Sequence, residues 1–467
     1  MSEQGLLHSQ EKMREAGVHP IAIDVFTRFY GMLEQNVDAI IHERDVEPLT
    51  DVMSLGEVFA EHAGDSIDPS ALAKTAVIKL NGGLGTSMGM QQAKSLLPVR
   101  GSSTFLDIIA QQVLHAREQY GVQLPLVFMN SFRTEQDTLS ALEAYPGLAT
   151  PGVPLSMLQN QEPKILSDSL EPLSFPANPE LEWCPPGHGD LYTVLQTSGV
   201  LDALEERGIE ILSISNADNL GAYPSPAIAS WFEASGAPFV AEVVRRTPAD
   251  RKGGHIVVRD GHLVLRETAQ INAEDEAQAS DISRHRYFNA NNLWIRVSAL
   301  REVLNKHQGV LPLPLIRNNK TADPSDSDTP SVVQLECAMG AAIELFPGAG
   351  ALEIDRSRFL PVKTTNDLLL VRSDVYELSE QFHLVVRGEE PLITLDPDYF
   401  ALIEEFEGRF PHGVPAIRGA QGLDVTGPWR FGAGVSVRGR AQLVNQTEHE
   451  QQVPDGAVVT ENGLNAE

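Results

Sequence analysis

The 467-residue chain carries 64 acidic and 35 basic side chains, and its net charge of −29 disfavours polyanionic partners such as nucleic acids and acidic membranes. With 42% hydrophobic residues the composition is that of a globular protein, and the length suits two or three domains. The only cysteines, Cys184 and Cys337, lie far apart and form no CxxC pair, so a disulfide framework and a zinc cluster are not expected.

No apolar run approaches the roughly 18 residues of a membrane span. The segment Met1-Ser2-Glu3-Gln4 also lacks the basic and apolar regions of a signal peptide. We therefore expect a cytoplasmic protein with neither a membrane nor a nucleic acid as its partner.

Residues 1–70 have the pattern of a helical region. Apolar side chains between Ile21 and Ile41 recur at intervals of three and four residues, as on one face of an α-helix. No chemistry-bearing motif stands out here, so the region is expected to serve packing.

Residues 71–384 alternate between predicted strands and helices. Such alternation predicts a mainly parallel sheet covered by helices on both faces, with ligands at the carboxyl ends of its strands. The pattern predicts buried strands at 75–80, 125–130, 209–215 and 239–244, a helix at 104–120, a hairpin at 255–265, and exposed loops at 272–284 and 318–330.

Residues 385–467 consist of short apolar units set between glycines. A spacing of about six residues per unit is typical of a parallel β-helix. Such coils serve assembly or rigidity, and a homo-oligomer formed through this domain is one expectation.

A glycine-rich loop follows the first predicted strand. Residues 82–89 contain four glycines, which let a backbone turn tightly and expose its N–H groups to a phosphate, and Lys94 stands at the far end of the loop. The loop is not a P-loop, because Ala93 stands where glycine is required, and Met88 breaks the dinucleotide fingerprint. A turn without any ligand is the alternative.

Asp218 directly follows the strand predicted at 209–215. A carboxylate at that place, together with phosphate oxygens, suits Mg²⁺. The alternative is a helix N-cap, a role that aspartate fills equally well.

Three further constellations could bind an anionic sugar. His188, between Gly187 and Gly189, could meet an anion as a donor or a partial cation, although a lone histidine is more often structural. Lys363 lies in an apolar stretch and needs an anionic partner, either a carboxylate or a substrate phosphate. Amides concentrate at 288–294 and could read sugar hydroxyls, or simply form a turn. Taken together, these patterns indicate nucleotidyl transfer to a sugar phosphate.

The blocks at 80–95, 185–190, 215–221, 288–294 and 358–369 resemble those of the eukaryotic-type UTP–glucose-1-phosphate uridylyltransferases, also called UDP-glucose pyrophosphorylases. They occur in the order of that family over roughly residues 74–375. Ser87 stands where the usual bacterial enzyme and the UDP-N-acetylhexosamine pyrophosphorylases carry arginine, and this favours the glucose enzyme.

The resemblance implies an α/β fold of three parts. A mixed, mainly parallel nucleotidyltransferase sheet, Rossmann-like and flanked by helices, would occupy residues 71–384. An N-terminal helical region would precede it at 1–70, and a C-terminal left-handed parallel β-helix would follow at 385–467.

The implied reaction makes UDP-glucose and pyrophosphate from UTP and glucose 1-phosphate, reversibly and with Mg²⁺ as cofactor. Lys94 and Lys363 would be catalytic, and Asp218 would bind the metal. The residues that the resemblance places on the substrates are Leu80, Asn81, Gly82, Gly83, Met129, Gln159, Gly187 and Asn216 for the nucleotide, and His188, Glu242, Lys252, Asn291 and Asn292 for the sugar phosphate and nearby positions. The stretch 160–172 departs from the family in having fewer basic residues.

Other interpretations remain open at this point. A broader UDP-sugar pyrophosphorylase would also accept galactose or N-acetylglucosamine 1-phosphate. A non-catalytic regulatory homologue is disfavoured because it has no chemical need for Lys94, Asp218 and Lys363 together. A nicotinamide-dependent dehydrogenase is disfavoured by Met88 in the fingerprint.

Overall fold

The computed structural model describes residues 2–37, 39–61, 68–247, 250, 253–324 and 326–465. Within these ranges, none of the helices combines the length and the apolar character needed to cross a membrane.

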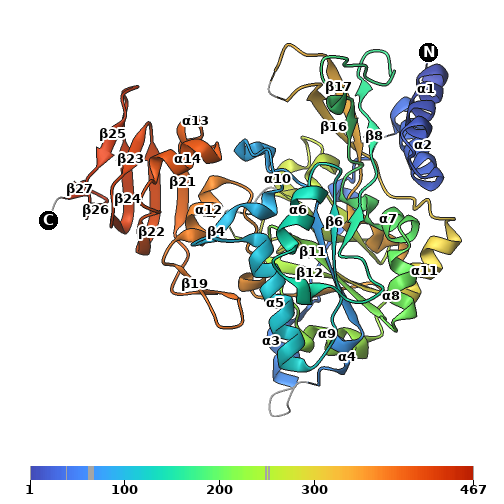
Figure 1. The fold of residues 1–467 in the computed structure, drawn as a ribbon, viewed down its shortest axis with the longest axis horizontal. Helices are drawn as coiled ribbons and strands as arrows, with labels where there is room; N and C mark the ends of the chain where they lie inside the picture. The colour runs from blue at the N-terminus through green and yellow to red at the C-terminus, as the bar shows by residue number, and fades with distance from the viewer. Residues whose placement is uncertain are drawn as a thin grey trace.

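An eight-stranded sheet forms the centre of the molecule (Figure 1). All neighbouring pairs in it are parallel except those of β15, which runs antiparallel to both β11 and β12. The mainly parallel sheet predicted from the sequence is therefore confirmed. Its strands, in spatial order, are β2 (Met53–Ser54), β18 (Gly350–Glu353), β12 (Phe239–Arg245), β15 (Tyr287–Arg296), β11 (Ile211–Asn216), β3 (Thr75–Asn81), β6 (Leu126–Asn130) and β7 (Ser156–Leu158).

Helices cover both faces of this sheet, which explains why β3 is buried along its whole length. Successive strand residues point to opposite faces. Val77 packs in one hydrophobic cluster with α5 (Phe105–Tyr120) and α9 (Pro226–Ser235). Ala76 and Ile78 pack in another cluster, and the helices that contribute to it include α2 (Pro20–Glu34), α7 (Leu191–Thr197), α8 (Val200–Glu206) and α11 (Val297–Lys306).

The N-terminal region is helical as predicted, but it also contributes strands. Its helices are α1 (Ser2–Glu15), α2, α3 (Leu55–Glu61) and α4 (Ser70–Ala73). β1 (Glu47–Pro48) pairs with β13 (His255–Arg259), and β2 pairs with β18 at the edge of the central sheet. Two residues are too few to show a periodic pattern in the sequence, so these strands could not be predicted. They form because partners elsewhere in the chain supply their hydrogen bonds.

Both predicted loops contain regular structure, and the predicted hairpin is confirmed. Residues 318–321 belong to β16 (Ile316–Thr321), which pairs with β17 (Ser331–Glu336); β16 is polar because it is only partly buried. The segment 272–284 contains the short helix α10 (Glu276–Ala279). The hairpin of β13 and β14 (His262–Arg266) is confirmed, with Asp260 and Gly261 both at positive φ, as a tight two-residue turn requires.

Shorter elements connect these layers, and their bounds complete the description. They are β4 (Pro98–Arg100), β5 (Ser103–Thr104), α6 (Glu135–Leu142), β8 (Glu162–Pro163), β9 (Ile165–Leu166), β10 (Trp183–Cys184), β19 (Tyr376–Leu378) and β20 (Leu384–Val386).

The C-terminal strands stand at one end of the molecule, opposite the N-terminal helices (Figure 1). β21 (Leu392–Leu395), β22 (Ala416–Thr426), β24 (Ser436–Val444) and β26 (Val458–Thr460) pair in parallel, as do β23 (Trp429–Phe431) and β25 (Gln451–Val453). β27 (Gly463–Asn465) pairs antiparallel with β26. The helices α12 (Thr365–Arg372), α13 (Pro397–Phe400) and α14 (Ile403–Arg409) contribute, with these strands, to the same hydrophobic cluster as α5 and α9.

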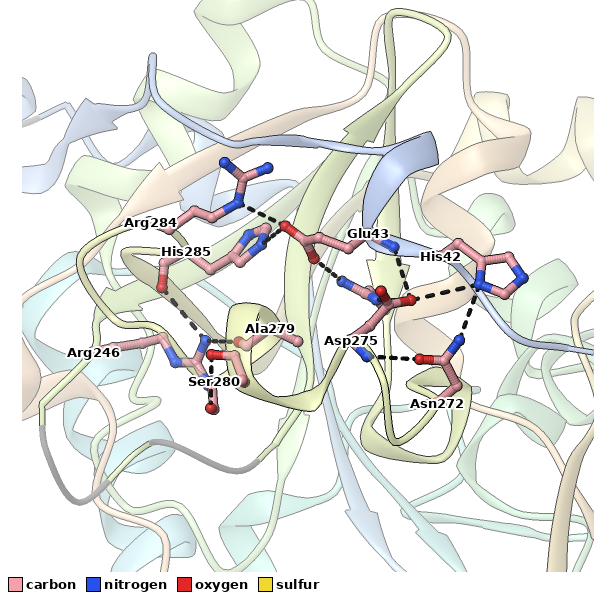
Figure 2. A network of polar contacts seen from close by, with 11 residues as sticks. His42, Glu43, Arg246, Asn272, Asp275, Ala279, Ser280, Arg284 and His285 are labelled. Atoms are coloured by element: carbon pink, nitrogen blue, oxygen red, sulfur yellow. Dashed lines mark hydrogen bonds and ion pairs between the residues drawn. The ribbon is translucent and has the colours of Figure 1, made fainter.

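A buried ionic network holds the N-terminal region to the central part (Figure 2). The carboxylate of Glu43 accepts hydrogen bonds from Arg266 at 2.5 Å, Arg284 at 2.6 Å and His285 at 2.9 Å. Burial alone would raise the pKa of Glu43, but these three donors outweigh it and lower the pKa to about 2. Arg266 is fully buried, and Glu43 is its nearest counter-charge, with the carboxylate of Asp275 farther away at 3.8 Å.

We predict that Glu43→Gln lowers the free energy of unfolding by about 3–5 kcal/mol, because it leaves the buried Arg266 guanidinium with only the more distant carboxylate of Asp275 as a counter-charge. Urea unfolding of the purified variant measures this. The control is Glu377→Gln, which removes an exposed partner of Arg387 and should cost less than about 1 kcal/mol. Because the folded-state pKa of Glu43 lies below its ordinary 4.5, the ionised carboxylate stabilises the wild type above pH 4.5, and this contribution is lost as pH falls towards 2. Equal losses in the two variants would contradict the role of Glu43.

Candidate functional site

A cavity of about 290 Å³ lies at the edge of the sheet where β3, β6 and β11 end. These strands are parallel neighbours, so their carboxyl ends meet at one edge, which is where ligands gather in sheets of this kind. Most of the residues predicted to bind a ligand line this cavity. They are Leu80, Asn81, Gly82, Gly83, Lys94, Met129, Gln159, Gly187, His188, Asn216 and Asp218, joined by Ser95, Pro185 and Ala217.

The glycine loop folds back on itself so that Lys94 returns to the end of β3. The Lys94 backbone N–H donates to the carbonyl of Gly83 at 3.1 Å, and Lys94 then begins a short 3₁₀ turn that ends at Leu96. Asn81 anchors the start of the loop by donating its amide hydrogens to Asn130 at 2.8 Å and Thr138 at 2.9 Å. The loop is therefore a fixed wall of the cavity.

Lys94 and Asp218 meet across the cavity. Nζ of Lys94 lies 2.5 Å from Oδ2 of Asp218, and the two side chains are only 15% and 19% exposed. Oδ1 of Asp218 is buried and has no hydrogen-bond partner among the residues described. A buried carboxylate oxygen without a partner is unusual and marks a place for a donor or a cation.

The donor set around Asp218 fits a hard divalent cation shared with a ligand. Nowhere in the described part of the chain do three His, Cys, Asp or Glu side chains come together as a metal site. A cation at Asp218 would therefore complete its coordination with ligand oxygens and water. Mg²⁺ is commonly bound in this way, through one or two carboxylates and the phosphates of a substrate.

The turn at Gly187 brings His188 to the cavity wall. Gly187 has a φ of 79°, and a Cβ on it would lie 2.7 Å from the carbonyl oxygen of Cys337. No other residue fits here without moving the chain, because both the dihedral angle and the space are restricted. The backbone N–H of Gly189 donates to the same carbonyl at 2.8 Å, which fixes the turn.

His188 is a neutral hydrogen-bond donor in this structure. Its Nδ1 accepts from the backbone N–H of Met339 at 3.1 Å, so the ring proton is left on Nε2. Burial lowers the pKa of His188 to about 4. Of the two roles expected for His188 towards an anion, donor and partial cation, the structure favours the donor.

Gln159 bridges the glycine loop and the Gly187 turn. Its Nε2 donates to the carbonyl of Gly187 at 2.7 Å, and its backbone N–H donates to Asn130 at 2.7 Å. Its Oε1 lies so close to Gly82 that a Cβ there would be only 2.6 Å away. Gly82 therefore lets the end of the Gln159 side chain lie against the loop, and a larger residue there would have to displace it.

A bulge in β15 carries Asn291 towards Asn216. The pairing with β12 shifts from Glu242–Asn292 to Val243–Asn289, so two residues of β15 are left over. Asn291 is one of them and has a φ of 56°. Its Nδ2 donates to Oδ1 of Asn216 at 3.2 Å, which joins the bulge to the cavity wall.

Glu242 and Asn292 lie beneath the site instead of in its wall. Glu242 is fully buried, and it accepts hydrogen bonds from Trp294 at 2.8 Å, Asn292 at 2.9 Å and Arg358 at 3.0 Å. Asn292 is only 3% exposed. The expectation that Glu242 touches a sugar directly does not agree with this position, since its oxygens are occupied by protein donors. The pair supports the bulge that bears Asn291.

Lys363 is exposed, contrary to the expectation of an apolar setting. In the described part of the chain its ammonium forms no ion pair, and it lies 6.0 Å from the centre of the Phe288 ring. The neighbouring Val362 N–H donates to the carbonyl of Asp218 at 3.3 Å, so Lys363 stands close to the Asp218 turn without lining the cavity. Lys252 falls outside the described residues.

Sequence reasoning gave no role to Lys79, in the first predicted strand, or to Asn219, in the 215–221 block. Lys79 is buried under the site and donates to Ser215 and to the carbonyl of Ala222, both at 2.8 Å. Asn219 follows Asp218 and is 2% exposed. The available signal was a polar side chain within a segment predicted to be buried. Such a side chain is expected to be hydrogen-bonded, and therefore to have a structural role.

Comparison with protein families gives one match that spans most of the chain. A family model described as UTP–glucose-1-phosphate uridylyltransferase matches residues 23–438. The protein of that name from Saccharomyces cerevisiae is 40% identical over 394 residues, which is 84% of this chain and 78% of the yeast protein. The one from Solanum tuberosum is 37% identical over 401 residues, 84% of this chain and 82% of the potato protein.

Solved structures agree with these matches over nearly the whole chain. A UDP-glucose phosphorylase from Trypanosoma brucei has a TM-score of 0.90 at 39% identity and covers 98% of this chain and 99% of its own. A point mutant of UDP-glucose pyrophosphorylase from Leishmania major, in complex with UDP-glucose, has a TM-score of 0.90 at 39% identity and covers 98% of both chains.

Proposed function

The chain belongs to the family of UTP–glucose-1-phosphate uridylyltransferases, and on that premise we propose that it makes UDP-glucose and pyrophosphate from UTP and glucose 1-phosphate. The observation that carries the proposal is the cavity at the carboxyl edge of the sheet. It combines a glycine loop, the Lys94–Asp218 pair and a neutral histidine donor, which together suit a polyphosphate with a metal ion.

The reaction exchanges one phosphorus–oxygen bond for another. A phosphate oxygen of glucose 1-phosphate attacks the α-phosphorus of UTP, and the bond from that phosphorus to the pyrophosphate leaving group breaks. An ionised phosphate is already a nucleophile and needs no general base, so the protein contributes positioning and charge stabilisation. The same arrangement serves the reverse reaction.

Lys94 and Lys363 offset the negative charge that gathers as two anions meet. Lys94 lies at the end of the glycine loop with its ammonium in the cavity, where it can transfer from Asp218 to a phosphate of UTP. Lys363 is exposed beside the Asp218 turn and forms no ion pair with the residues described, so it is suited to the phosphate of the incoming sugar. His188 donates from Nε2 without adding charge.

Asp218 holds Mg²⁺ in this proposal, since its buried Oδ1 lacks a partner among the described groups. The ion, when bound, supplies charge neutralisation on the phosphate oxygens. The position of Asp218 is maintained by its backbone, because its carbonyl accepts a hydrogen bond from the N–H of Val362 at 3.3 Å.

The residues proposed for the nucleotide and those proposed for the sugar meet at Asn216 and Asn291. Leu80 to Gly83, with Met129, Gln159, Gly187 and Asn216, form one continuous wall, and Gln159 offers an amide suited to a pyrimidine edge. Asn291 reaches the same cavity wall from the β15 bulge and is suited to sugar hydroxyls. Glu242 and Asn292 act on the sugar only through that bulge.

The C-terminal strands fit a left-handed β-helix. Leu423 pairs with Ala441 and Val425 with Leu443, so one coil spans 18 residues there, the length of three six-residue faces. Inward residues stack in register along Ile393, Leu423 and Ala441. A crystal structure that showed a right-handed coil would exclude this assignment.

One assay tests the activity and the sugar preference together. The purified chain, UTP and Mg²⁺ are mixed separately with the 1-phosphates of glucose, galactose and N-acetylglucosamine, and pyrophosphate release is followed. Release with glucose 1-phosphate alone is expected, and release with all three would indicate a broader UDP-sugar pyrophosphorylase. No release with any sugar would overturn the proposal and favour a non-catalytic homologue.

We predict that Lys363→Ala lowers kcat by about 10³-fold or more, because the variant loses a cation that meets charge in the transition state. The fold should survive, since Lys363 is exposed. The control is Lys306→Ala, which removes an exposed lysine at the end of α11. Steady-state kinetics and thermal unfolding of both variants make the comparison. Near-normal turnover of Lys363→Ala would remove this assignment.

Gly82→Ala should weaken UTP binding by roughly 10- to 100-fold. The added Cβ would lie 2.6 Å from Oε1 of Gln159, so the amide of Gln159 has to move from its place in the cavity wall, and the expected loss corresponds to about 1.4–2.8 kcal/mol of binding free energy. Isothermal calorimetry measures the dissociation constant. In the control, Gly408→Ala, the new Cβ meets nothing within 4 Å in α14 and binding should not change. If the two variants bound UTP equally well, Gln159 would not be part of the nucleotide wall.

Asp218→Asn should lower kcat by about 10²–10³-fold and raise the Mg²⁺ concentration needed for half-maximal rate, because the amide keeps the shape but loses the charge. A Mg²⁺ titration of the initial rate at saturating UTP measures both effects. The control is Asp424→Asn on an outward position of β22. A Mg²⁺ dependence identical to that of the wild type would exclude Asp218 as the ligand.

A further inference from the structure

Asn219 has every hydrogen-bonding position of its amide filled. Its Nδ2 donates to Oδ1 of Asn292 at 3.2 Å and to the carbonyl of Arg358 at 3.1 Å. Its Oδ1 accepts from the backbone N–H groups of Leu360 at 2.9 Å and Gly221 at 3.2 Å. Two donors and two acceptor sites are the whole capacity of an asparagine side chain.

These bonds join three segments that are far apart in the sequence and that each carry part of the site. The first is the turn after β11, which bears Asp218. The second is β15, where Asn292 supports the bulge of Asn291. The third is the extended segment 358–363, which ends at Lys363 and is also bridged to Asn219 through Pro361.

The side chain is 2% exposed and does not line the cavity, so it acts on substrates only through its neighbours. The backbone hydrogen bond from the N–H of Val362 to the carbonyl of Asp218 joins the 358–363 segment to the same turn. Without this amide, the hydrogen bonds that hold the 358–363 segment and β15 against the Asp218 turn would be lost, and both could shift relative to Asp218. Displacements of about 1 Å in such a site can cost 10²-fold in rate.

We propose that Asn219 is a positioning residue that sets the spacing of Lys363 and the Asn291 bulge relative to Asp218. The inference rests on the proposed uridylyl transfer and deepens it. Asn219 holds three groups in a fixed arrangement: the carboxylate of Asp218, the bulge that bears Asn291, and Lys363, which is proposed to meet the sugar phosphate. Its own effect is on alignment and leaves the nucleotide wall at Gln159 unchanged.

Asn219→Asp is the sharpest variant. The carboxylate keeps the bonds accepted from Leu360 and Gly221, but it has no N–H for Asn292 and Arg358 and faces their oxygens with its own. The link to β15 and to the Arg358 carbonyl is therefore broken while the shape is preserved. A buried amide elsewhere in the chain provides the matched control.

Asn445 is that control, in the C-terminal strands. It is 4% exposed, and its amide is equally full, donating to Pro428 at 3.1 Å and His449 at 2.9 Å and accepting from the backbone and the hydroxyl of Thr447 at 3.0 and 2.8 Å. Asn445→Asp removes the same two donors. Any effect common to both variants reports only the loss of a buried hydrogen-bonded amide.

The experiment compares wild type, Asn219→Asp and Asn445→Asp as full-length chains. Thermal unfolding, UTP affinity by calorimetry, and kcat and KM for glucose 1-phosphate are measured. We expect kcat/KM for glucose 1-phosphate to fall by about 10²-fold in Asn219→Asp. In the same variant UTP affinity should stay near that of the wild type, and Asn445→Asp should keep its activity. Equal activities of the two variants would overturn the inference.

The remaining outcomes are also decisive. If the wild type releases no pyrophosphate, the proposed function fails; if the wild type is active and Asn219→Asp matches it, only the positioning role fails. If Asn219→Asp does not fold, Asn219→Ser replaces it and should show the same selective loss for the sugar phosphate. Failure of both to fold, while Asn445→Asp folds, would make Asn219 a folding residue and would overturn its role in alignment.

Discussion

The contact between Lys94 and Asp218 is the one on which the site depends. It joins the end of the glycine loop to the end of β11, two segments that only the parallel pairing of β3 and β11 brings to the same edge. It also keeps a lysine and a carboxylate compensated inside a partly buried cavity, where either charge alone would be costly. A phosphate and a cation can replace the two partners one for one, so binding exchanges one compensated arrangement for another.

A layer of buried polar side chains supports that contact from below. Lys79 donates hydrogen bonds to Ser215 and to the carbonyl of Ala222, which lie on either side of the Asp218 turn. Glu242 accepts hydrogen bonds from Asn292 and Arg358. Such a layer is stable only when its members are fully paired, and a full network allows few alternative geometries. The loop that carries Asp218 therefore behaves as part of the sheet.

The sequence predicted the central elements because their signals are local. β3, β6, β11 and β12 are apolar runs, and the glycine loop and Asp218 follow two of them directly. β1 and β2 could not be predicted, since two residues gain their structure from partners about 200 to 300 positions away. For the same reason the sequence could not tell that Glu242 lies under the site or that Lys363 is exposed. Residue type predicts chemistry, whereas tertiary pairing decides which atoms remain free.

The acidity of the chain and the anionic substrates proposed for it are compatible because charge acts locally. At physiological ionic strength, interactions between exposed charges are largely screened beyond about 8 Å, so the net charge of −29 has little influence inside the cavity. There Lys94 lies at the cavity wall and Lys363 close to it, while Lys79 is buried beneath, where burial and the charge of Arg358 lower its pKa to about 7. An anion in the cavity would therefore meet the ammonium of Lys94 at short range, and this contact would outweigh the distant acidic side chains.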